Sequence, residues 1–406
     1  MLKITTIGGG NGQSTLLDGF FTELGNKVKI SSIVSMSDDG RTTGKLMKSF
    51  ENELNLHLPP PGDLRRCLFS LSESEYRDYF KLIFEYTFLN EESISEFTIM
   101  DLFKQVNKEL LFFGRGAELK EELIKFVNFC KGNLFEKIDM KCKNVFKFKL
   151  PLKVSLKGHK FGNILMASLY YNLEKGNNDG YEKMIDFMHE LLEVRGKVIP
   201  VTTKRAYIKA ILGNGEVVNN QDRISNVADY NSGIADLELK ECSKGANHNI
   251  SVHKAIINAD YIVVGPGDLF TSIISNFIIG GVKNSIKCSK AKVIYIGNST
   301  NKGGETTGLT QLDFVNKIER FLGKNIDYFV LNNKKLKLDV DELKKFKNNI
   351  SIKGGDYLFL SRGEKEELEK RNIKVIEANL LSKKSLYKHS RKKLIPILEK
   401  IIFNKK

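Results

Sequence analysis

Short apolar runs alternate with amphipathic segments along most of the chain, and this alternation predicts an α/β fold. β-Branched and apolar residues dominate the runs, which is typical of strands buried on both faces of a parallel sheet. The segments between them have helical spacing, as in repeated βα units. The predicted strands are residues 3–7, 28–34, 259–264, 292–296, 327–331 and 374–378.

Three other patterns complete the expected organisation. Residues 73–148 combine charged and aromatic side chains at helical spacing, which predicts a helical insertion. The β-rich runs 198–211 and 216–218 flank Asn214-Gly215, a strong hairpin signal, so we expect an antiparallel β-hairpin attached to the sheet. Residues 386–403 predict an amphipathic C-terminal helix. We therefore expect three parts: the first half of a Rossmann-like core in 1–72, the helical insertion in 73–150, and the rest of the core in 151–406.

The first strand runs directly into a glycine-rich loop, Gly8 to Gly12, and then into a helix. Strand, glycine loop and helix is the layout that holds a phosphate, because backbone N–H groups and the helix N-terminus face the anion. Gln13 stands where a dinucleotide fingerprint has its third glycine, and no Walker sequence follows. A tight turn with spare glycines is the alternative. The candidate ligand-binding residues are Gly9, Gly10, Asn11, Gly12 and Ser14.

A second strand–loop–helix unit begins at strand 259–264, which ends in Gly265-Pro266-Gly267. Because both glycine loops follow strands of one parallel sheet, we expect them to face a single cleft at the same sheet edge. Strand 292–296 ends in another polar loop at that edge. The candidate ligand-binding residues here are Gly265, Gly267, Asp268, Phe270, Thr271, Ser272 and Asn298.

Polar residues in three further segments are candidates for the same site. Asp38 and Asp39 follow strand 28–34, where paired carboxylates can hold hydrated Mg²⁺ or a sugar hydroxyl; a helix-capping turn is the alternative. Arg65 lies in the first turn of a predicted helix, where a cation is unfavourable unless it meets an anion. A Pro-rich connector is the alternative for the segment that contains Arg65. The third segment contains His159 ahead of a predicted helix, and a structural histidine is the alternative there. The candidates are Asp38, Asp39, Gly40, Thr43, Gly62, Asp63, Arg65, His159 and Asn163, with Asp39 and Asp63 as candidate Mg²⁺ ligands.

Composition narrows the choice of partners. The 406 residues carry a formal net charge of +15, but residues 382–406 hold nine Lys or Arg against one acid. No nucleic-acid motif accompanies the charge, which argues against a nucleic-acid partner. No apolar stretch approaches the ~20 residues of a membrane span. Five dispersed cysteines and the lack of a signal sequence indicate a cytoplasmic protein with reduced thiols.

The ordered motifs of the chain resemble the CofD-like superfamily, and within it the YvcK-type gluconeogenesis factors. The matching segments are IGGGNGQSTLL, SDDGRTTG, PPGDLRRCL, GHKFGN, ADYIVVGPGDLFTSI and GGET, and the late YKHSRKKL is similar to the start of the family's last helix. The resemblance implies a Rossmann-like, doubly wound, mostly parallel sheet with a shared cleft. It also implies a cytoplasmic protein that binds nucleotide-sugars of the UDP type, such as UDP-GlcNAc, and supports cell-envelope synthesis and cell shape.

Some residues depart from the family pattern. Asn11 replaces the threonine of the family's usual GGGTG loop, and Arg41 replaces a small residue. Phe270 replaces a tyrosine that the family links to nucleotide-sugar contact. Two function classes stay open. One is a nucleotide-sugar binding protein that catalyses no reaction; the other is a Mg²⁺-dependent 2-phospho-L-lactate transferase of coenzyme F420 biosynthesis. The sequence names no catalytic residue and no cofactor other than Mg²⁺, and it leaves a homo-oligomer open.

Overall fold

The computed structural model describes residues 1–89, 93–113, 148–174, 180–204, 206–226, 233–348, 355–383 and 385–404. Part of the expected helical insertion, residues 114–147, lies outside the described residues. The chain divides into two compact units, one of Met1–Asp39 with Gly196–Lys406 and one of Gly40–Arg195. The expected division at residues 72 and 150 stays a prediction, and each unit is described by itself below.

The first unit is built on a seven-stranded sheet in which every neighbouring pair is parallel. Buried apolar residues fill most of these strands, as the sequence predicts for a sheet covered on both faces. The predicted Rossmann-like α/β fold is therefore confirmed. In sheet order the strands are β12 (Lys374–Ala378), β11 (Tyr328–Asn332), β10 (Lys292–Ile296), β9 (Tyr261–Val264), β1 (Leu2–Gly8), β2 (Val28–Val34) and β5 (Lys197–Pro200).

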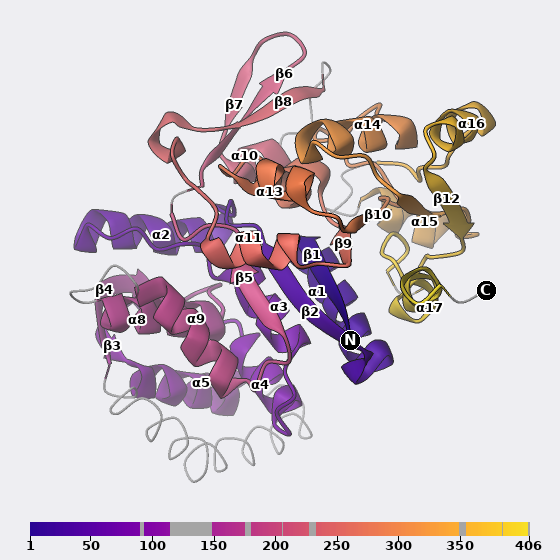
Figure 1. Ribbon diagram of the computed structural model, residues 1–406. Helices are drawn as coiled ribbons and strands as arrows, with labels where there is room; N and C mark the ends of the chain where they lie inside the picture. Colours follow the sequence, from indigo (N-terminus) through magenta and orange to yellow (C-terminus); the bar gives the residue numbers. More distant parts are fainter. Residues whose placement is uncertain are drawn as a thin grey trace. The chain divides into compact units, whose positions relative to one another are not determined.

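The strand order reverses between β1 and β9. From β1 the chain passes through α1 (Gly10–Gly19) to β2 on one side, and from β9 it passes through α13 (Val282–Cys288) to β10 on the other. Right-handed crossovers in opposite directions place α1 and α13 on opposite faces of the sheet. The helices accordingly form two groups: α1 contacts α17 (Arg391–Ile402), while α13 contacts α11 (Ile250–Ile257) and α14 (Gln311–Leu322) (Figure 1). The sheet is doubly wound, with its switch point between β1 and β9.

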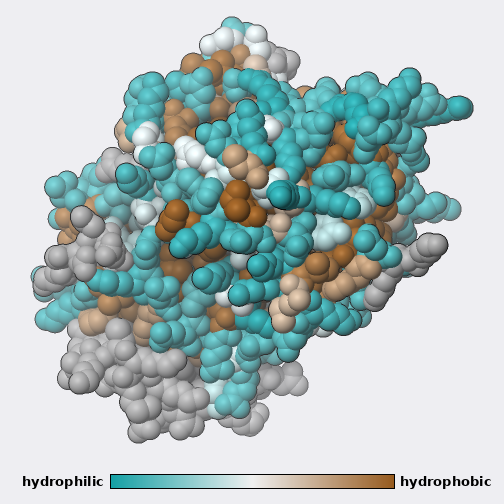
Figure 2. Space-filling model, viewed as in Figure 1, coloured by the Kyte–Doolittle hydropathy of each residue, from teal (hydrophilic) through white to brown (hydrophobic). Residues whose placement is uncertain are grey.

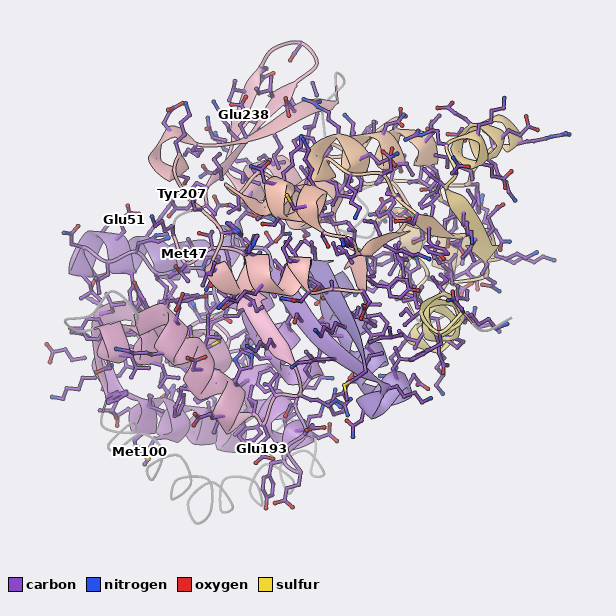
Figure 3. The ribbon with its side chains drawn as sticks, in the orientation of Figure 1. Met47, Glu51, Met100, Glu193, Tyr207 and Glu238 are labelled. Atoms are coloured by element: carbon purple, nitrogen blue, oxygen red, sulfur yellow. The ribbon has the colours of Figure 1, made fainter. Side chains whose placement is uncertain are left out.

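A separate three-stranded antiparallel sheet belongs to the same unit. It consists of β7 (Val217–Asn219), β6 (Ile208–Leu212) and β8 (Ile234–Leu239), and the β6–β7 turn contains the predicted Asn214-Gly215. Figure 3 labels Tyr207, which directly precedes β6, and Glu238, which lies in β8. The hairpin is confirmed, but the single run 198–211 is wrong: its first part is β5 of the parallel sheet and its last part is β6.

The described residues of the second unit form six helices and a two-stranded antiparallel sheet, β3 (Ser93–Thr98) and β4 (Lys149–Ser155). The strand β3 corrects the expectation that the described part of the insertion is helical throughout. Phe84 packs edge-on against Phe69, Phe80 and Phe161, so the aromatic residues form core, as expected. The helices are α2 (Arg41–Leu54), α3 (Gly62–Ser70), α4 (Arg77–Phe84), α5 (Ile99–Phe113), α8 (Phe161–Glu174) and α9 (Gly180–Leu191).

Two helices of the C-terminal part, α14 and α17, have well-defined starts. Thr310 and Asp313 form a capping box that begins α14. The C-terminal helix α17 begins at Arg391, five residues later than expected, because residues 385–390 form a turn that contacts the loop after β10.

In the described residues no helix has the length and apolar composition of a membrane span. The face in Figure 2 is largely hydrophilic. The other helices are α10 (Gln221–Asn226), α12 (Ser275–Phe277), α15 (Val340–Lys347) and α16 (Arg362–Lys370).

Candidate ligand-binding site

The two glycine loops touch at the carboxyl ends of the neighbouring strands β1 and β9. A Cβ atom on Gly12 would lie 2.2 Å from the carbonyl oxygen of Pro266, so only glycine permits this approach. A Cβ on Gly267 would lie 3.5 Å from the carbonyl oxygen of Gly9, and one on Gly10 would lie 3.7 Å from Ser272 Oγ. The expectation that both loops meet at one sheet edge is therefore confirmed. The two loops flank the switch point of the sheet.

The first loop presents the start of α1. Gly9 is the N-cap residue; it makes no side-chain cap hydrogen bond, and the first turn of α1 contains no acidic residue. Gln13 fixes the helix to the sheet, because its Nε2 donates to Thr6 Oγ1, Ser32 Oγ and the Ile33 carbonyl. The hydroxyl of Ser14 donates to the Asn11 carbonyl at 3.1 Å, so this predicted ligand donor is used inside the loop. The backbone of the loop is the part suited to an anion.

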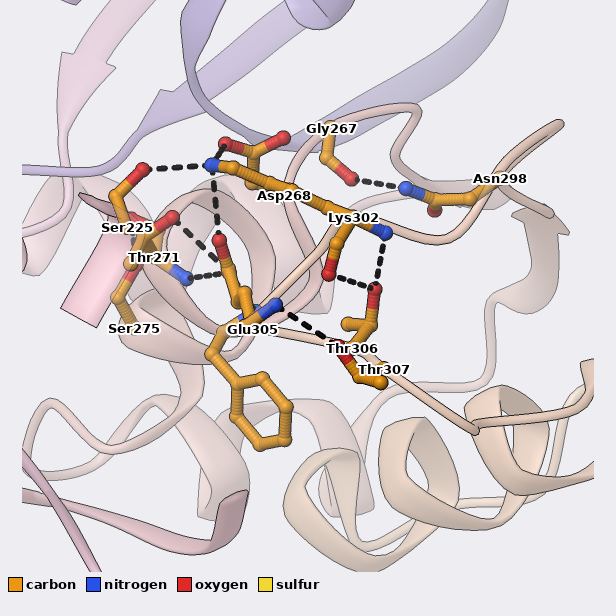
Figure 4. Close-up of polar contacts among 12 residues, drawn as sticks. Ser225, Gly267, Asp268, Thr271, Ser275, Asn298, Lys302, Glu305, Thr306 and Thr307 are labelled. Carbon is orange, nitrogen blue, oxygen red and sulfur yellow. Dashed lines mark hydrogen bonds and ion pairs between the residues drawn. The ribbon is translucent and has the colours of Figure 1, made fainter. Parts of the chain in front are cut away.

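The second loop leads into a helical turn, Leu269–Ile274, whose first amides already meet an anion. Glu305 Oε1 accepts from the N–H groups of Phe270 and Thr271 at 3.1 and 3.2 Å, and from Thr271 Oγ1 at 3.2 Å. Figure 4 shows these contacts. The sequence suggests a ligand anion at this helix start, and the structure instead places the carboxylate of Glu305 there. A phosphate at this helix start would compete with Glu305.

The ring of Phe270 is also enclosed by the protein. Its residue exposure is 0%, and the ammonium of Lys317 lies 5.5 Å from the ring centre. Stacking of this ring on a ligand, which the resemblance implies, requires the ring to become accessible, so that contact stays a prediction.

Lys302 connects Glu305 to the loop itself. Its Nζ lies 2.6 Å from Asp268 Oδ2, 3.0 Å from Glu305 Oε2 and 2.6 Å from Ser225 Oγ (Figure 4). Burial alone would lower the pKa of Lys302, but the carboxylates of Glu305 and Asp268 outweigh it, and the net shift is upward. Burial raises the pKa of Glu305, while the Lys302 ammonium opposes that rise. Lys302 is therefore a cation at neutral pH.

The loop after β2 lies against the same segment. Ser35 Oγ and Ser275 Oγ are 2.9 Å apart, and Ser37 Oγ donates to the Thr271 carbonyl. Asp39 turns to the start of α10, where its Oδ1 accepts from the Asp222 N–H at 3.0 Å. Burial raises the pKa of Asp39, and hydrogen bonds from two backbone amides oppose this. The alternative of a helix-capping aspartate therefore describes Asp39, although it caps α10 and not the next helix along the chain.

Asn298 supports the second glycine loop from the end of β10. Its Nδ2 donates to the Gly267 carbonyl at 2.9 Å, and the Asn298 carbonyl in turn accepts from Gln311 Nε2 at 2.9 Å. Asn298 Oδ1 is buried and has no hydrogen-bond partner among the described residues, so it is an acceptor available to a ligand donor. The predicted candidate Asn298 thus adjoins the glycine loops.

In the second unit, Arg65 already has a protein anion. Its side chain is 1% exposed, and its Nη1 lies 2.6 Å from Glu85 Oε1 and donates to the Phe84 carbonyl. Its Nε donates to Asn163 Oδ1 at 3.0 Å, which joins two predicted candidates. Burial lowers the pKa of Arg65 to about 10, although Glu85 opposes the shift. In the structure Glu85 supplies an anion to Arg65 in the first turn of α3, and roles of Arg65 and Asn163 in ligand binding stay predictions.

The other candidates of this unit lie near the starts of α2, α3 and α8. Asp63 is paired with Arg66 at 3.0 Å, the neighbouring arginine in the first turn of α3. His159 is 2% exposed, and burial, with Lys45 nearby, lowers its pKa to about 4. The imidazole is therefore neutral at pH 7. Roles of Gly40, Thr43, Gly62, Asp63 and His159 in ligand binding stay predictions.

The candidate Mg²⁺ ligands fit a metal only in part. Mg²⁺ in proteins commonly uses one or two carboxylates together with substrate phosphates. Asp39 Oδ2 is buried and has no hydrogen-bond partner among the described residues, so it could serve as such a carboxylate. Asp63 is engaged by Arg66. The described part of the chain contains no cluster of three or more His, Cys, Asp or Glu with metal-site geometry.

Three residues that sequence reasoning leaves out of the site support it. Lys302 and Glu305 lie in the polar loop after β10, and Gln311 begins α14. The signal was partly visible, because Gly303-Gly304-Glu305-Thr306 is a polar loop at the carboxyl end of a predicted strand. The pairing of Lys302 with Asp268, 34 residues away, could not be predicted from spacing.

Comparisons with known proteins place this geometry in a family. The family described as 2-phospho-L-lactate transferase CofD matches residues 4–381. A putative gluconeogenesis factor of Thermotoga maritima is 28% identical over 82% of this chain and 80% of its own. A gluconeogenesis factor of Halalkalibacterium halodurans is 27% identical over 80% of this chain and 75% of its own. A crystal structure of a protein from Bacillus halodurans has the same fold, with a TM-score of 0.70, 24% identity and coverage of 99% of both chains. The chain therefore belongs to the CofD family.

Proposed function

We propose that this protein binds a nucleotide-sugar of the UDP type at its two glycine loops and releases it unchanged. The position of the loops carries the proposal. They flank the point where the strand order reverses, and open parallel sheets bind ligands outside the carboxyl ends of the strands at that point. Its relatives are described as gluconeogenesis factors, which supports a role in metabolism, and the resemblance extends this proposal to cell-envelope synthesis and cell shape.

The contrast between the loops supports a specific orientation of the ligand. The first turn of α1 contains no acidic residue, whereas the amides of Phe270 and Thr271 donate to the carboxylate of Glu305. A helix start favours phosphate, and a carboxylate already at the helix start opposes a second anion there. We therefore assign the phosphates of the ligand to the first loop. Asp268 and Asn298 then supply polar groups for the sugar or the base.

The second candidate function is the transferase, and the description of the matching family favours it. Asp39 Oδ2 could contribute to Mg²⁺ binding together with ligand phosphates. The hydroxyls of Ser14 and Thr15, however, donate to the Asn11 carbonyl, and that of Thr271 donates to Glu305, so none of these three is paired with a histidine as its base. Phosphoryl-type transfer can proceed by positioning and metal electrostatics, so activity has to be measured.

The test combines mass spectrometry with a turnover assay. We expect purified protein to carry a UDP-sugar, and UDP-N-acetylglucosamine incubated with the protein and Mg²⁺ to be recovered intact. Transfer of phospholactate to a deazaflavin acceptor, lost in Asp39→Asn, would instead establish the transferase. A co-purified deazaflavin or guanine nucleotide would point to the same conclusion.

A further inference from the structure

Lys302 and Glu305 form a buried ion pair; Glu305 belongs to the GGET motif, but neither the resemblance nor the proposed ligand contacts give this pair a role. The side chains are 10% and 0% exposed, and Lys302 Nζ lies 3.0 Å from Glu305 Oε2. Removing two charges from water is costly, so a buried pair is weak support for stability alone. The segments that the pair holds together indicate a different role.

Glu305 acts on the second glycine loop through the backbone. Its Oε1 receives both N–H groups at the start of the Leu269–Ile274 turn, and its other oxygen faces Lys302. The carboxylate therefore occupies the place where a phosphate would bind, and it fixes the direction in which this turn leaves the loop.

Lys302 acts on two segments far from it in sequence. Asp268 is the last residue of the second loop, and its Oδ2 lies 2.6 Å from Lys302 Nζ. Ser225 is in the last turn of α10, and its Oγ lies 2.6 Å from the same atom. The first turn of α10 is held by Asp39, from the loop after β2. The loops after β2, β9 and β10 are thus connected through α10 and Lys302.

We infer that Lys302 and Glu305 are positioning residues, which fix the second glycine loop and couple it to α10. The effect of this role on ligand affinity rests on the proposed function, whereas the positional role can be tested without a ligand. Loss of the Lys302 ammonium leaves Glu305 as a buried carboxylate without its cation, which favours a protonated or displaced side chain. The amides of Phe270 and Thr271 then lose a charged acceptor.

Hydrogen exchange measured by mass spectrometry tests the positional role in full-length protein. In Lys302→Met we expect at least tenfold faster exchange at Phe270 and Thr271 and in α10, with unchanged exchange in β11 and β12. Glu305→Gln should accelerate the same amides, and Lys302→Arg should restore most of the protection. Lys324→Met is the matched control, because Lys324 Nζ donates to the Ser289 and Ala291 carbonyls before β10 and contacts neither loop.

The inference is overturned if Lys302→Met and Glu305→Gln exchange like the wild type. It is equally overturned if exchange rises by the same factor throughout the sheet, because that result indicates general destabilisation. Titration with UDP-N-acetylglucosamine adds a second readout: Lys302→Met should bind at least tenfold more weakly, and Lys324→Met should bind as the wild type does. A wild type that does not bind this probe would contradict the proposed function, and the exchange data would still decide the inference.

Discussion

Charged side chains near helix starts in this protein have partners within the chain. Arg65 meets Glu85, 20 residues later; Asp39 caps α10, 183 residues later; and Glu305 meets the turn that begins at Leu269. A charge next to a helix start can be recognised from sequence, since the helix dipole makes it significant. The partner cannot, because it is brought there by chain folding. This is why the sequence assigns a ligand anion to Arg65 and to the helix start after the second glycine loop, where the structure places Glu85 and Glu305.

At the scale of single residues, His159 should make the protein sensitive to acid. Burial lowers its pKa to about 4, whereas an unfolded histidine has a pKa near ~6.5. Between these values the unfolded state binds more protons, so the free energy of unfolding falls as the pH drops from about 6.5 to about 4. The shift corresponds to roughly 3 kcal/mol. Urea unfolding at pH 7.5 and pH 5 measures the part of this loss that falls above pH 5, about 2 kcal/mol.

His159→Gln provides the comparison for this effect, because glutamine keeps a polar side chain and does not titrate. We expect the variant to lose less stability than the wild type over the same pH interval. An identical loss in both proteins would show that other groups cause the acid sensitivity.

At the scale of elements, the sequence predicts best the strands whose β-forming run ends at a polar residue or a glycine, namely Ser35 after β2, Gly297 after β10 and Asn379 after β12. β2, β10 and β12 have the predicted bounds, since β-branched runs are flanked there by polar or glycine residues. The run 198–211 has β-forming composition throughout, and no hairpin signal marks the bend between β5 and β6. The strand β3 lies in a segment with helical spacing, and its partner β4 begins only at Lys149. A local sequence pattern does not predict which distant strand a segment pairs with.

The contact between α3 and α8 explains two of the ordered motifs. A Cβ on Gly162 would lie 2.5 Å from Arg65 Cδ, so glycine makes room for the arginine stem, and Asn163 accepts from Arg65 Nε. Arg65→Met should therefore lower the free energy of unfolding by roughly 2–4 kcal/mol, because Glu85 loses its main partner while Lys160, 3.4 Å away, compensates in part. Urea unfolding measures this change.

Arg66→Met is the internal control, since Arg66 follows Arg65 in α3 but is one-third exposed and pairs with Asp63. Partly exposed pairs contribute about 1 kcal/mol or less. If both variants lose the same stability, the buried pair of Arg65 and Glu85 does not hold α3 and α8 together.

At the scale of the whole molecule, the position of the site depends on strand order. The local sequence pattern and the ordered motifs predict the fold class. They also predict that the candidate loops lie at the carboxyl edge of the sheet. The pairing of β1 with β9 joins residues more than 250 positions apart, and no local signal specifies it. Only this pairing places the switch point between the glycine loops. The site is therefore a property of the assembled sheet, to which each loop contributes half.

The most direct measurement is calorimetric titration of UDP-N-acetylglucosamine into the wild type, Gly12→Ala and Gly363→Ala. Both glycines lie in the first turn of a helix, but an added Cβ meets the Pro266 carbonyl at Gly12 and nothing within 4 Å at Gly363. We expect saturable binding to the wild type, the same affinity for Gly363→Ala, and binding to Gly12→Ala weakened at least tenfold, about 1.4 kcal/mol. No binding to the wild type, or equal binding to all three proteins, would contradict a nucleotide-sugar site formed by the two glycine loops.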